Sequence, residues 1–448
     1  MTGAGIRSQP EVSRGRRAAL IDLVSSMAVR GASAPLALAA NVLLARILGP
    51  ASLGIYMTLL STGLIAGRIS AYGVGPVLTR EIAACQPDQR GPAISSMARW
   101  ALKLTGSLSL VGVVLAMLWL TYGPASPPNS LAERLAAVAI IPACAWSTIP
   151  SGLLSGLSKV ASGLAVGNLW KNAILLAGLL AFFLAGRVDI ASVLVLQAGS
   201  FACAAVIGVA SIQRLVPRVS RSLRLRAARP APARTTAWRR SAGHFLSLSL
   251  AWLVLGRLDV ILVNALADAR QAGLFGVAAR VGQVASIAGL VWAAWLQPRV
   301  SRAVQDRQAS ELRSILGIGY VGAVSTTSLL VTGGWLLAPK LMSLMGSSFV
   351  AGAVWPFRWL ILGYLVWGLS IPLYAFMSMT NGEAQLSRIL WTQAGLTLAI
   401  SVPLIHAWGA LGGAWAWSGG LAVGSLGIIV TGYKRMSRLS LTPSQRNA

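Results

Sequence analysis

Long apolar runs follow one another along almost the whole chain of 448 residues. Each run has the length that an α-helix needs to cross roughly 30 Å of hydrocarbon, about twenty residues. The runs lack the alternation of polar and apolar residues that strands of a membrane barrel show. We therefore predict an all-α polytopic membrane protein with transmembrane helices near residues 20–48, 55–78, 102–122, 131–157, 163–185, 190–213, 245–266, 273–296, 315–337, 350–377, 389–407 and 411–433. The expected number of spans is about twelve.

The composition supports this class, because 55% of the residues are hydrophobic and only 11% are charged, against about a quarter charged in soluble domains. The first apolar run exceeds the core of about 7–15 residues that a secretory signal peptide has, so no cleavable signal is expected. The three cysteines, Cys85, Cys144 and Cys203, show neither paired nor metal-ligand spacing. We expect them to be reduced packing residues, and no metal site is predicted.

The net charge of +27 would suit nucleic-acid binding, but the placement of the charges indicates otherwise. Arginine and lysine gather before the first span, in the even-numbered links and after the last span. The odd-numbered links hold few of them, chiefly Arg134, Arg187, Arg270 and Lys340. Under the positive-inside rule this alternation places both termini in the cytoplasm. A nucleic-acid partner is not predicted.

One long polar segment, rich in Arg, Pro and Ala, divides the spans six and six. The predicted units are a basic tail (1–19), a six-helix bundle (20–213), an Arg-rich cytoplasmic loop (214–242), a second six-helix bundle (243–433) and a basic tail (434–448). We expect the loop to lie on the anionic inner leaflet, where each basic residue gains about 1 kcal/mol; binding of an acidic partner is the alternative. An internal repeat is indicated by LGIY (53–56) with PVLTR (76–80), which correspond to GLFG (273–276) with PRVSR (298–302).

Four stretches carry a resemblance to a known family: LARILGPASLGIYMTLLS (44–61), RLDVILVNALADARQAGLFGVAARV (257–281) followed by LQPRVSRAV (296–304), APKLMSLMGSSFVAGAVWPFRWLILG (338–363) and GALGGAWAWS (409–418). They resemble the oligosaccharide and polysaccharide flippases of the MOP (MATE-like) superfamily. The resemblance implies two six-helix bundles around a V-shaped cavity that opens alternately to either side. It also implies a lipid-linked saccharide substrate of the undecaprenyl-phosphate type, in a bacterial cytoplasmic membrane.

Charged residues inside the predicted spans are candidates for function, because a charge at the bilayer centre costs roughly 2.5–3.5 kcal/mol even on insertion scales. Five of those in mid-span are cationic, and we predict that they bind an anionic head group: Arg30, Arg68, Lys171, Arg257 and Arg280. Ion pairs that only joined helices would bring equal numbers of both signs. Arginine suits phosphate because its planar fork binds two phosphate oxygens at once.

Asp259 is the one acidic residue in this set. It lies two residues after Arg257, so on a helix the two side chains diverge. We expect Asp259 to pair with a cation of a neighbouring helix as a static latch; a site that couples transport to H⁺ or Na⁺ is the alternative. Asn168 and Asn172 share a helix face with Lys171, and Gln283 shares one with Arg280. These three amides are predicted to line the cavity.

No catalytic motif appears: His244 and His406 are the only histidines, and no cluster of carboxylates is present. We therefore expect a flippase and not an enzyme, without a cofactor. A MATE-type exporter of drugs or metabolites, which would favour an acidic cavity, is one alternative. A non-transporting scaffold for envelope assembly is the other. Expected partners are the lipid-linked saccharide, anionic lipid at the basic loops and membrane proteins of polysaccharide assembly.

Overall fold

The computed structural model describes residues 9–85, 90–123, 130–157, 159–186, 188–215, 232–306, 308–380 and 382–440. All regular structure in these ranges is helical, in the order α1 (Gln9–Ala71), α2 (Val74–Ala84), α3 (Arg90–Tyr122), α4 (Leu131–Gly156), α5 (Val160–Leu164), η2 (Ala165–Leu169), α6 (Trp170–Ala185), α7 (Ile190–Leu215), α9 (Pro232–Leu266), α10 (Ala269–Gly282), η3 (Gln283–Ala285), α11 (Ser286–Gln305), α12 (Ala309–Met345), α13 (Ser347–Met379) and α14 (Glu383–Ser440). The prediction of an all-α membrane fold is confirmed.

The described helices also account for the predicted number of spans. Nine helical segments among the described residues are long and apolar enough to cross a membrane. Two of these contain a break, α1 at Gly49 (φ 69°) and α14 at Gly409 (φ 53°). Glycine adopts such positive φ values readily because it has no Cβ. Each break falls on a predicted link between spans, so the breaks add two spans and α9 adds the twelfth.

The predicted span over 55–78 lies within an apolar helical segment but contains a break. α1 ends at Ala71 and α2 begins at Val74, with Tyr72 and Gly73 at positive φ between them. The break brings this backbone close to α9, since a Cβ on Gly73 would lie 2.4 Å from the carbonyl oxygen of Ala242. Two other predicted spans contain irregular turns: η2 is a π-helix within 163–185, and η3 is a 3₁₀ turn within 273–296.

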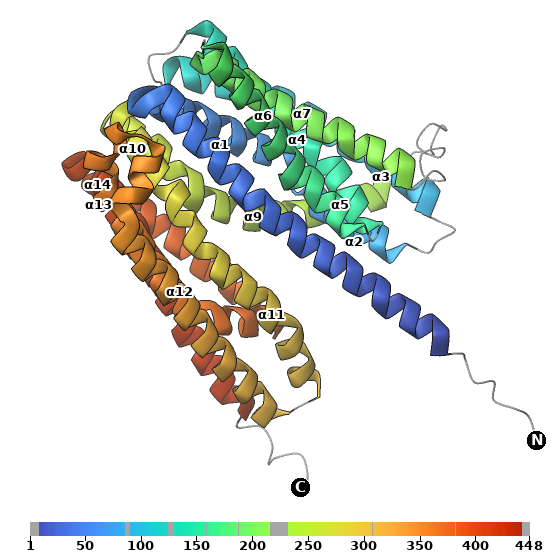
Figure 1. Ribbon diagram of the computed structural model, residues 1–448. Coiled ribbons are helices and arrows are strands. Elements are labelled where there is room, and N and C mark those ends of the chain that lie inside the picture. Colours follow the sequence, from blue (N-terminus) through green and yellow to red (C-terminus); the bar gives the residue numbers. More distant parts are fainter. Residues whose placement is uncertain are drawn as a thin grey trace, which may run out of the picture.

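The helices form two groups, which we call the N-terminal bundle (α1 to α7) and the C-terminal bundle (α9 to α14). α4 packs against α1, α2, α3 and α7, whereas α13 packs against α10, α11, α12 and α14. The bundles meet where α1 contacts α9 and α10. From this contact, at the upper left of Figure 1, they diverge towards the side on which α1 begins and α14 ends.

Helix α9 connects the two bundles. It begins at Pro232, so the last part of the predicted Arg-rich loop is helical, and residues 216–231 of that loop lie outside the described residues. Near its start, the ring of Trp238 lies 5.4 Å from that of Trp100 in α3. Further along, α9 packs against α10 and α14. Helix α9 thus contacts α1 and α3 of the N-terminal bundle and packs against α10 and α14 of its own bundle.

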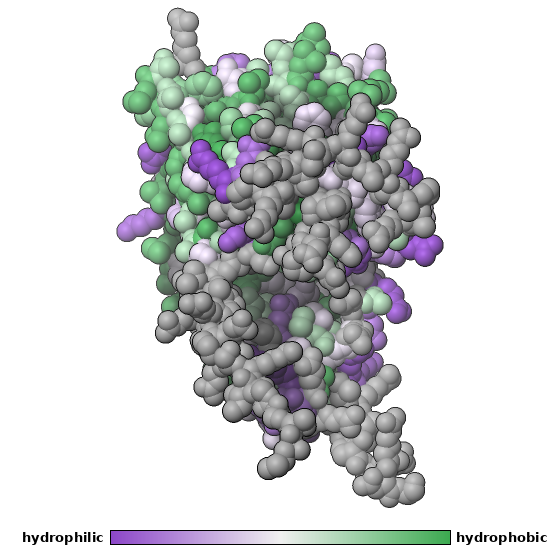
Figure 2. Space-filling view, turned by 90° about the vertical axis from the view of Figure 1, so that its right-hand side faces the viewer, coloured by the Kyte–Doolittle hydropathy of each residue, from purple (hydrophilic) through white to green (hydrophobic). Residues whose placement is uncertain are grey.

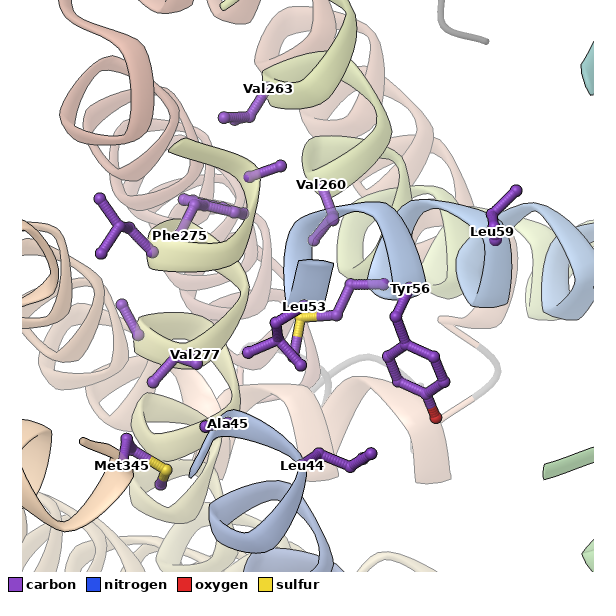
Figure 3. Packing of buried hydrophobic residues seen from close by; sticks show 14 of the residues in the cluster. Leu44, Ala45, Leu53, Tyr56, Leu59, Val260, Val263, Phe275, Val277 and Met345 are labelled. Atoms are coloured by element: carbon purple, nitrogen blue, oxygen red, sulfur yellow. The ribbon is translucent and has the colours of Figure 1, made fainter. Parts of the chain in front are cut away.

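Two glycines join the bundles at a seam where backbones touch. A Cβ on Gly54 of α1 would lie 1.7 Å from the carbonyl oxygen of Ala269, and a Cβ on Gly273 of α10 would lie 1.9 Å from that of Pro50. These glycines belong to the two repeat segments found in the sequence. Apolar side chains surround the seam, and Figure 3 shows that Leu53 points towards α10 while the neighbouring Tyr56 points away from it.

The outer surface of the bundles is apolar, as contact with lipid requires. On α3, Leu110 is 69% exposed and Leu115 is 60% exposed. Figure 2 shows hydrophobic residues over the upper part of one face and most hydrophilic residues lower down. Extended apolar surface of this kind marks a membrane contact in a folded chain. The protein is therefore a multi-pass membrane protein.

The last helix is fixed to its neighbour by one arginine. Arg435 of α14 donates hydrogen bonds through Nε to the Thr380 hydroxyl (3.1 Å) and through a terminal nitrogen to Gln385 Oε1 (3.4 Å). Its other terminal nitrogen donates to the carbonyl of Thr380. Thr380 follows the last residue of α13. The guanidinium thus connects the C-terminal part of α14 to the end of α13 and to the first turn of α14.

Candidate functional site

A cavity of about 500 Å³ lies between the two bundles. Its N-terminal wall comes from α1, η2, α6 and α7, and its C-terminal wall comes from α9, α10, η3 and α11. This volume is in the range of sites that hold a drug-sized ligand, roughly 300–1,000 Å³. A site between repeated halves is also where transporters of repeated architecture bind substrate.

The structure brings six of the predicted site residues together around this cavity. Asn168, Lys171 and Asn172 line the N-terminal wall, and Arg257, Arg280 and Gln283 line the opposite one. The cavity is therefore lined by three cations from two bundles. None of its lining residues is acidic.

Two predicted cations are placed differently. Arg68 is exposed and lines neither of the two cavities of this site. It lies within electrostatic reach of Lys171, but the geometry gives it no place on the cavity wall. Arg30 belongs to α1, but its side chain lies outside the described residues.

Four further lining residues were missed from the sequence: Asn41, Tyr56, Gln197 and Phe201. Asn41 and Gln197 are polar residues inside apolar runs, so the same reasoning that selected Asn168 and Asn172 would have found them. Tyr56 and Phe201 are aromatic residues among many in apolar spans. Nothing in the sequence distinguishes them from packing residues.

Local contacts orient the N-terminal wall. The ammonium of Lys171 lies 5.2 Å from the centre of the Phe201 ring, within the range of a cation–π interaction. Tyr56 donates its hydroxyl proton to Gln197 Oε1 (3.2 Å), and Gln197 Nε2 donates to the hydroxyl of Ser200 (3.2 Å). Both polar ends of Gln197 are thereby used within the protein. The side chain holds Tyr56 at the edge of the cavity.

Asp259 occupies a second, smaller space of about 60 Å³ beside the main cavity. It is only 5% exposed, and Tyr364 and Trp417 line this space with it. Arg280 and Gln283 line both spaces, whereas Arg257 lines only the larger one of the two. Residues 257 and 259 therefore face different spaces, in keeping with their spacing on a helix.

The expected ion pair of Asp259 is not found. Among the described side chains, no Arg or Lys nitrogen lies within 4.0 Å of its carboxylate. For Arg257 the physical reason is the spacing, because side chains two residues apart diverge on a helix. The described contacts thus give no support to a static interhelical latch. No group of three or more His, Cys, Asp or Glu in the described ranges could hold a metal ion.

Long apolar helices in two bundles, with cationic and amide side chains in the cavity between them, are the architecture of a membrane transporter. The model of the family described as "Polysaccharide biosynthesis protein" matches residues 20–304. The chain belongs to this family. No curated protein sequence matches it.

Solved structures of MOP-superfamily transporters share this fold. A multidrug resistance MATE transporter in an inward-facing conformation aligns over 94% of this chain and 100% of its own, with a TM-score of 0.76 and 15% identity. The lipid II flippase MurJ, inward closed, aligns over 94% of this chain and 90% of its own, with a TM-score of 0.68 and 12% identity. A MOP transporter from Pyrococcus furiosus aligns over 93% of this chain and 97% of its own, with a TM-score of 0.55 and 15% identity. These structures confirm the predicted fold, and the family match confirms the predicted relation to polysaccharide biosynthesis proteins.

Proposed function

We propose that this protein is a flippase that moves a lipid-linked oligosaccharide or polysaccharide precursor across the bacterial cytoplasmic membrane for cell-surface polysaccharide biosynthesis. One observation carries the proposal: the cavity between the bundles is lined by Lys171, Arg257 and Arg280, with no acidic residue among its lining. Such a cavity attracts a phosphate or diphosphate and repels a cation. An exporter of cationic drugs would need the opposite polarity. The family match to polysaccharide biosynthesis supports the same substrate class.

The proposed cycle is alternating access. The TM-score is 0.76 against an inward-facing relative and 0.56 against an outward-facing one, which supports an inward-open arrangement for the present structure. The positive-inside pattern supports a cytoplasmic position for both termini and for the open end. An undecaprenyl-linked precursor enters from the inner leaflet with its tail in the bilayer. The bundles then rock about their contact, and the sugar leaves on the other side.

Coupling to H⁺ or Na⁺ is assigned to Asp259. Its carboxylate is buried without an ion pair among the described side chains, and a buried charge of that kind calls for a proton or a cation. The residue shares its small space with Arg280 and Gln283, which also line the main cavity. An ion bound there is therefore placed to affect the substrate site.

The basic segments of the chain suggest which lipids and proteins surround the transporter. The Arg-rich segment 214–242 and the two basic tails are proposed to lie on anionic lipid of the inner leaflet. The units 20–213 and 243–433 are proposed to move as the two rocking bodies. Membrane proteins of polysaccharide assembly are the proposed protein partners.

Complementation of a flippase-deficient bacterium tests the proposal. Surface glycan and accumulated lipid-linked precursor are measured for wild type, Arg257→Ala and Arg280→Ala at equal membrane levels. Arg358→Ala is the matched control, because this arginine of α13 stacks on Trp335 (5.2 Å) and Trp355 (5.0 Å) and lines neither cavity of the site.

We expect wild type and the control to restore surface glycan, and the two cavity variants to accumulate precursor. Full activity of both cavity variants would contradict the anion-binding role of these arginines. Export of cationic dyes by the wild type without any effect on surface glycan would favour the MATE-type exporter.

A further inference from the structure

The N-terminal wall of the cavity differs chemically from the C-terminal wall. Besides Gln197, whose two polar ends bond within the protein, three carboxamides from separate helical segments line it: Asn41 of α1, Asn168 of η2 and Asn172 of α6. We call this set of three the amide wall. The facing wall carries the two arginines, Arg257 and Arg280, and a single carboxamide, Gln283. Carboxamides thus predominate on one side of the cavity and arginines on the other.

The hydrogen bonds of the amide wall show which polar atoms of each amide remain available to a ligand. Asn41 Nδ2 donates to the carbonyl of Ala37 (2.7 Å), Asn172 Nδ2 to that of Ser33 (3.3 Å) and Asn168 Nδ2 to that of Leu164 (3.5 Å). A carbonyl oxygen only accepts, so the atom facing it in each case must be the NH₂ group. Each carboxamide oxygen is left without a hydrogen-bond donor among the described residues.

The three oxygens are acceptors that an ionised phosphate, which offers only acceptors, cannot use, while each NH₂ group keeps a second N–H that can donate. Such groups pair best with a partner that both donates and accepts. They suit a ligand with hydroxyl or amide N–H donors. A cationic donor is disfavoured, since Lys171 lies on the same helix face as Asn168 and Asn172 and repels positive charge. The neutral donors that accompany a lipid diphosphate in the proposed substrate are the hydroxyl groups of its first sugar.

The local backbone supports a binding role for this wall. Asn168 lies in the π-helix Ala165–Leu169, and single π-helical turns within α-helices occur frequently at functional sites. A π-helical turn changes the direction of the side chains that follow it. Here Lys171 and Asn172 follow within one turn and face the cavity.

We propose that the amide wall binds the sugar next to the lipid diphosphate, while Arg257, Arg280 and Lys171 hold the diphosphate itself. This proposal rests on the proposed function and refines its substrate. The amide wall then selects for a glycan, and the three cations select for the anionic linkage.

The test measures binding of two probes to purified full-length protein in lipid nanodiscs. One probe is undecaprenyl diphosphate, and the other is undecaprenyl-diphosphate-linked N-acetylglucosamine. The variant is Asn41→Leu with Asn168→Leu, since both amides bond to their own helix and their loss leaves helix packing in place. Gln308→Leu, the same change at an exposed amide before α12, is the matched control.

Wild type and control are expected to bind the sugar-bearing lipid more tightly than the sugar-free one. The double variant should lose about fivefold in affinity for the sugar-bearing lipid for each amide removed, with unchanged affinity for the sugar-free lipid. Arg280→Ala should weaken both. Equal loss for both lipids in the double variant, or no preference in the wild type, overturns the sugar assignment. Failure of the wild type to bind either lipid overturns the proposed function itself and the inference with it.

Discussion

The glycine seam between the bundles predicts which substitution shifts the balance between the two open states. In Gly54→Ala, the new methyl group would lie 1.7 Å from the carbonyl oxygen of Ala269 and 2.8 Å from the backbone nitrogen of Gly273. Both contacts are with backbone, so no flexible side chain can move aside. Separation of the bundles at this end removes the clash, because the contacts join α1 to α10. The substitution therefore destabilises the present state relative to one in which the seam is open.

The size of the shift follows from the cost of overpacking. Forcing an extra methyl group into a tightly packed contact costs roughly 1–3 kcal/mol, which changes the ratio of the two states by about five- to 150-fold. Alanine also favours a helix over glycine by about 1 kcal/mol. That gain is the same in both states, so it cancels in the ratio. Gly419→Ala is the control, since a Cβ there meets nothing within 4 Å.

The assay is a distance measurement between spin labels at the seam end of each bundle. Leu131 begins α4 and is 62% exposed, and Ser343 lies exposed near the end of α12. Labels at these two positions, in a background without native cysteines, report the separation of the bundles by double electron–electron resonance. We expect a longer distance to become populated in Gly54→Ala and not in Gly419→Ala. An unchanged distribution in Gly54→Ala would refute the reasoning that the seam holds this end closed.

Three further predictions concern single side chains. Arg435→Ala should destabilise the protein by about 2–3 kcal/mol, because three hydrogen bonds from a charged group are lost; unfolding in denaturing detergent measures this, and an unchanged transition would contradict it. The hydrogen bond from Ser192 lowers the pKa of the exposed Asp189 carboxyl, and a lowered pKa adds stability that is lost as the pH falls through the folded value. Acidification through that range should therefore lower the melting temperature of wild type more than that of Asp189→Asn. Asp259→Asn should weaken the dependence of undecaprenyl diphosphate binding on pH and Na⁺ relative to wild type, because the neutral side chain no longer binds a proton or a cation; a dependence equal to that of wild type would remove Asp259 from the coupling site.

Periodic features of the sequence were sufficient to predict the helices. The length of each apolar run is set by the thickness of the bilayer, and the basic links alternate because one side of the membrane retains positive charge. Both features can be read directly from the sequence. Contacts between distant segments are not visible in this way. In the run 55–78, Gly73, Gly75 and Pro76 favour a break, but nothing in the sequence shows that the backbone at Gly73 approaches Ala242 of another helix.

The residues of the candidate site also differ in whether the sequence alone could reveal them. Lys171, Arg257 and Arg280 could be predicted because a charge in an apolar span is costly wherever the helix faces. Arg68 shows the limit of that rule, since its exposed side chain lines neither cavity of the site. The pairing expected for Asp259 failed for a related reason: the sequence gives the number of charges in a span, but not which helix faces turn towards each other.

In the proposed cycle, the shared lining of the two cavities gives a physical route from ion to substrate. Asp259 lines the same small space as Arg280, and a negative charge there reduces the attraction of that cation for a phosphate in the main cavity. A proton or Na⁺ at Asp259 removes this effect, so ion and anionic lipid favour each other's binding. Linkage requires the coupling to be equal in both directions, so the bound lipid must also raise the affinity of Asp259 for the ion. Release of the ion on one side of the membrane then weakens the hold on the substrate on that side, without contact between the two ligands.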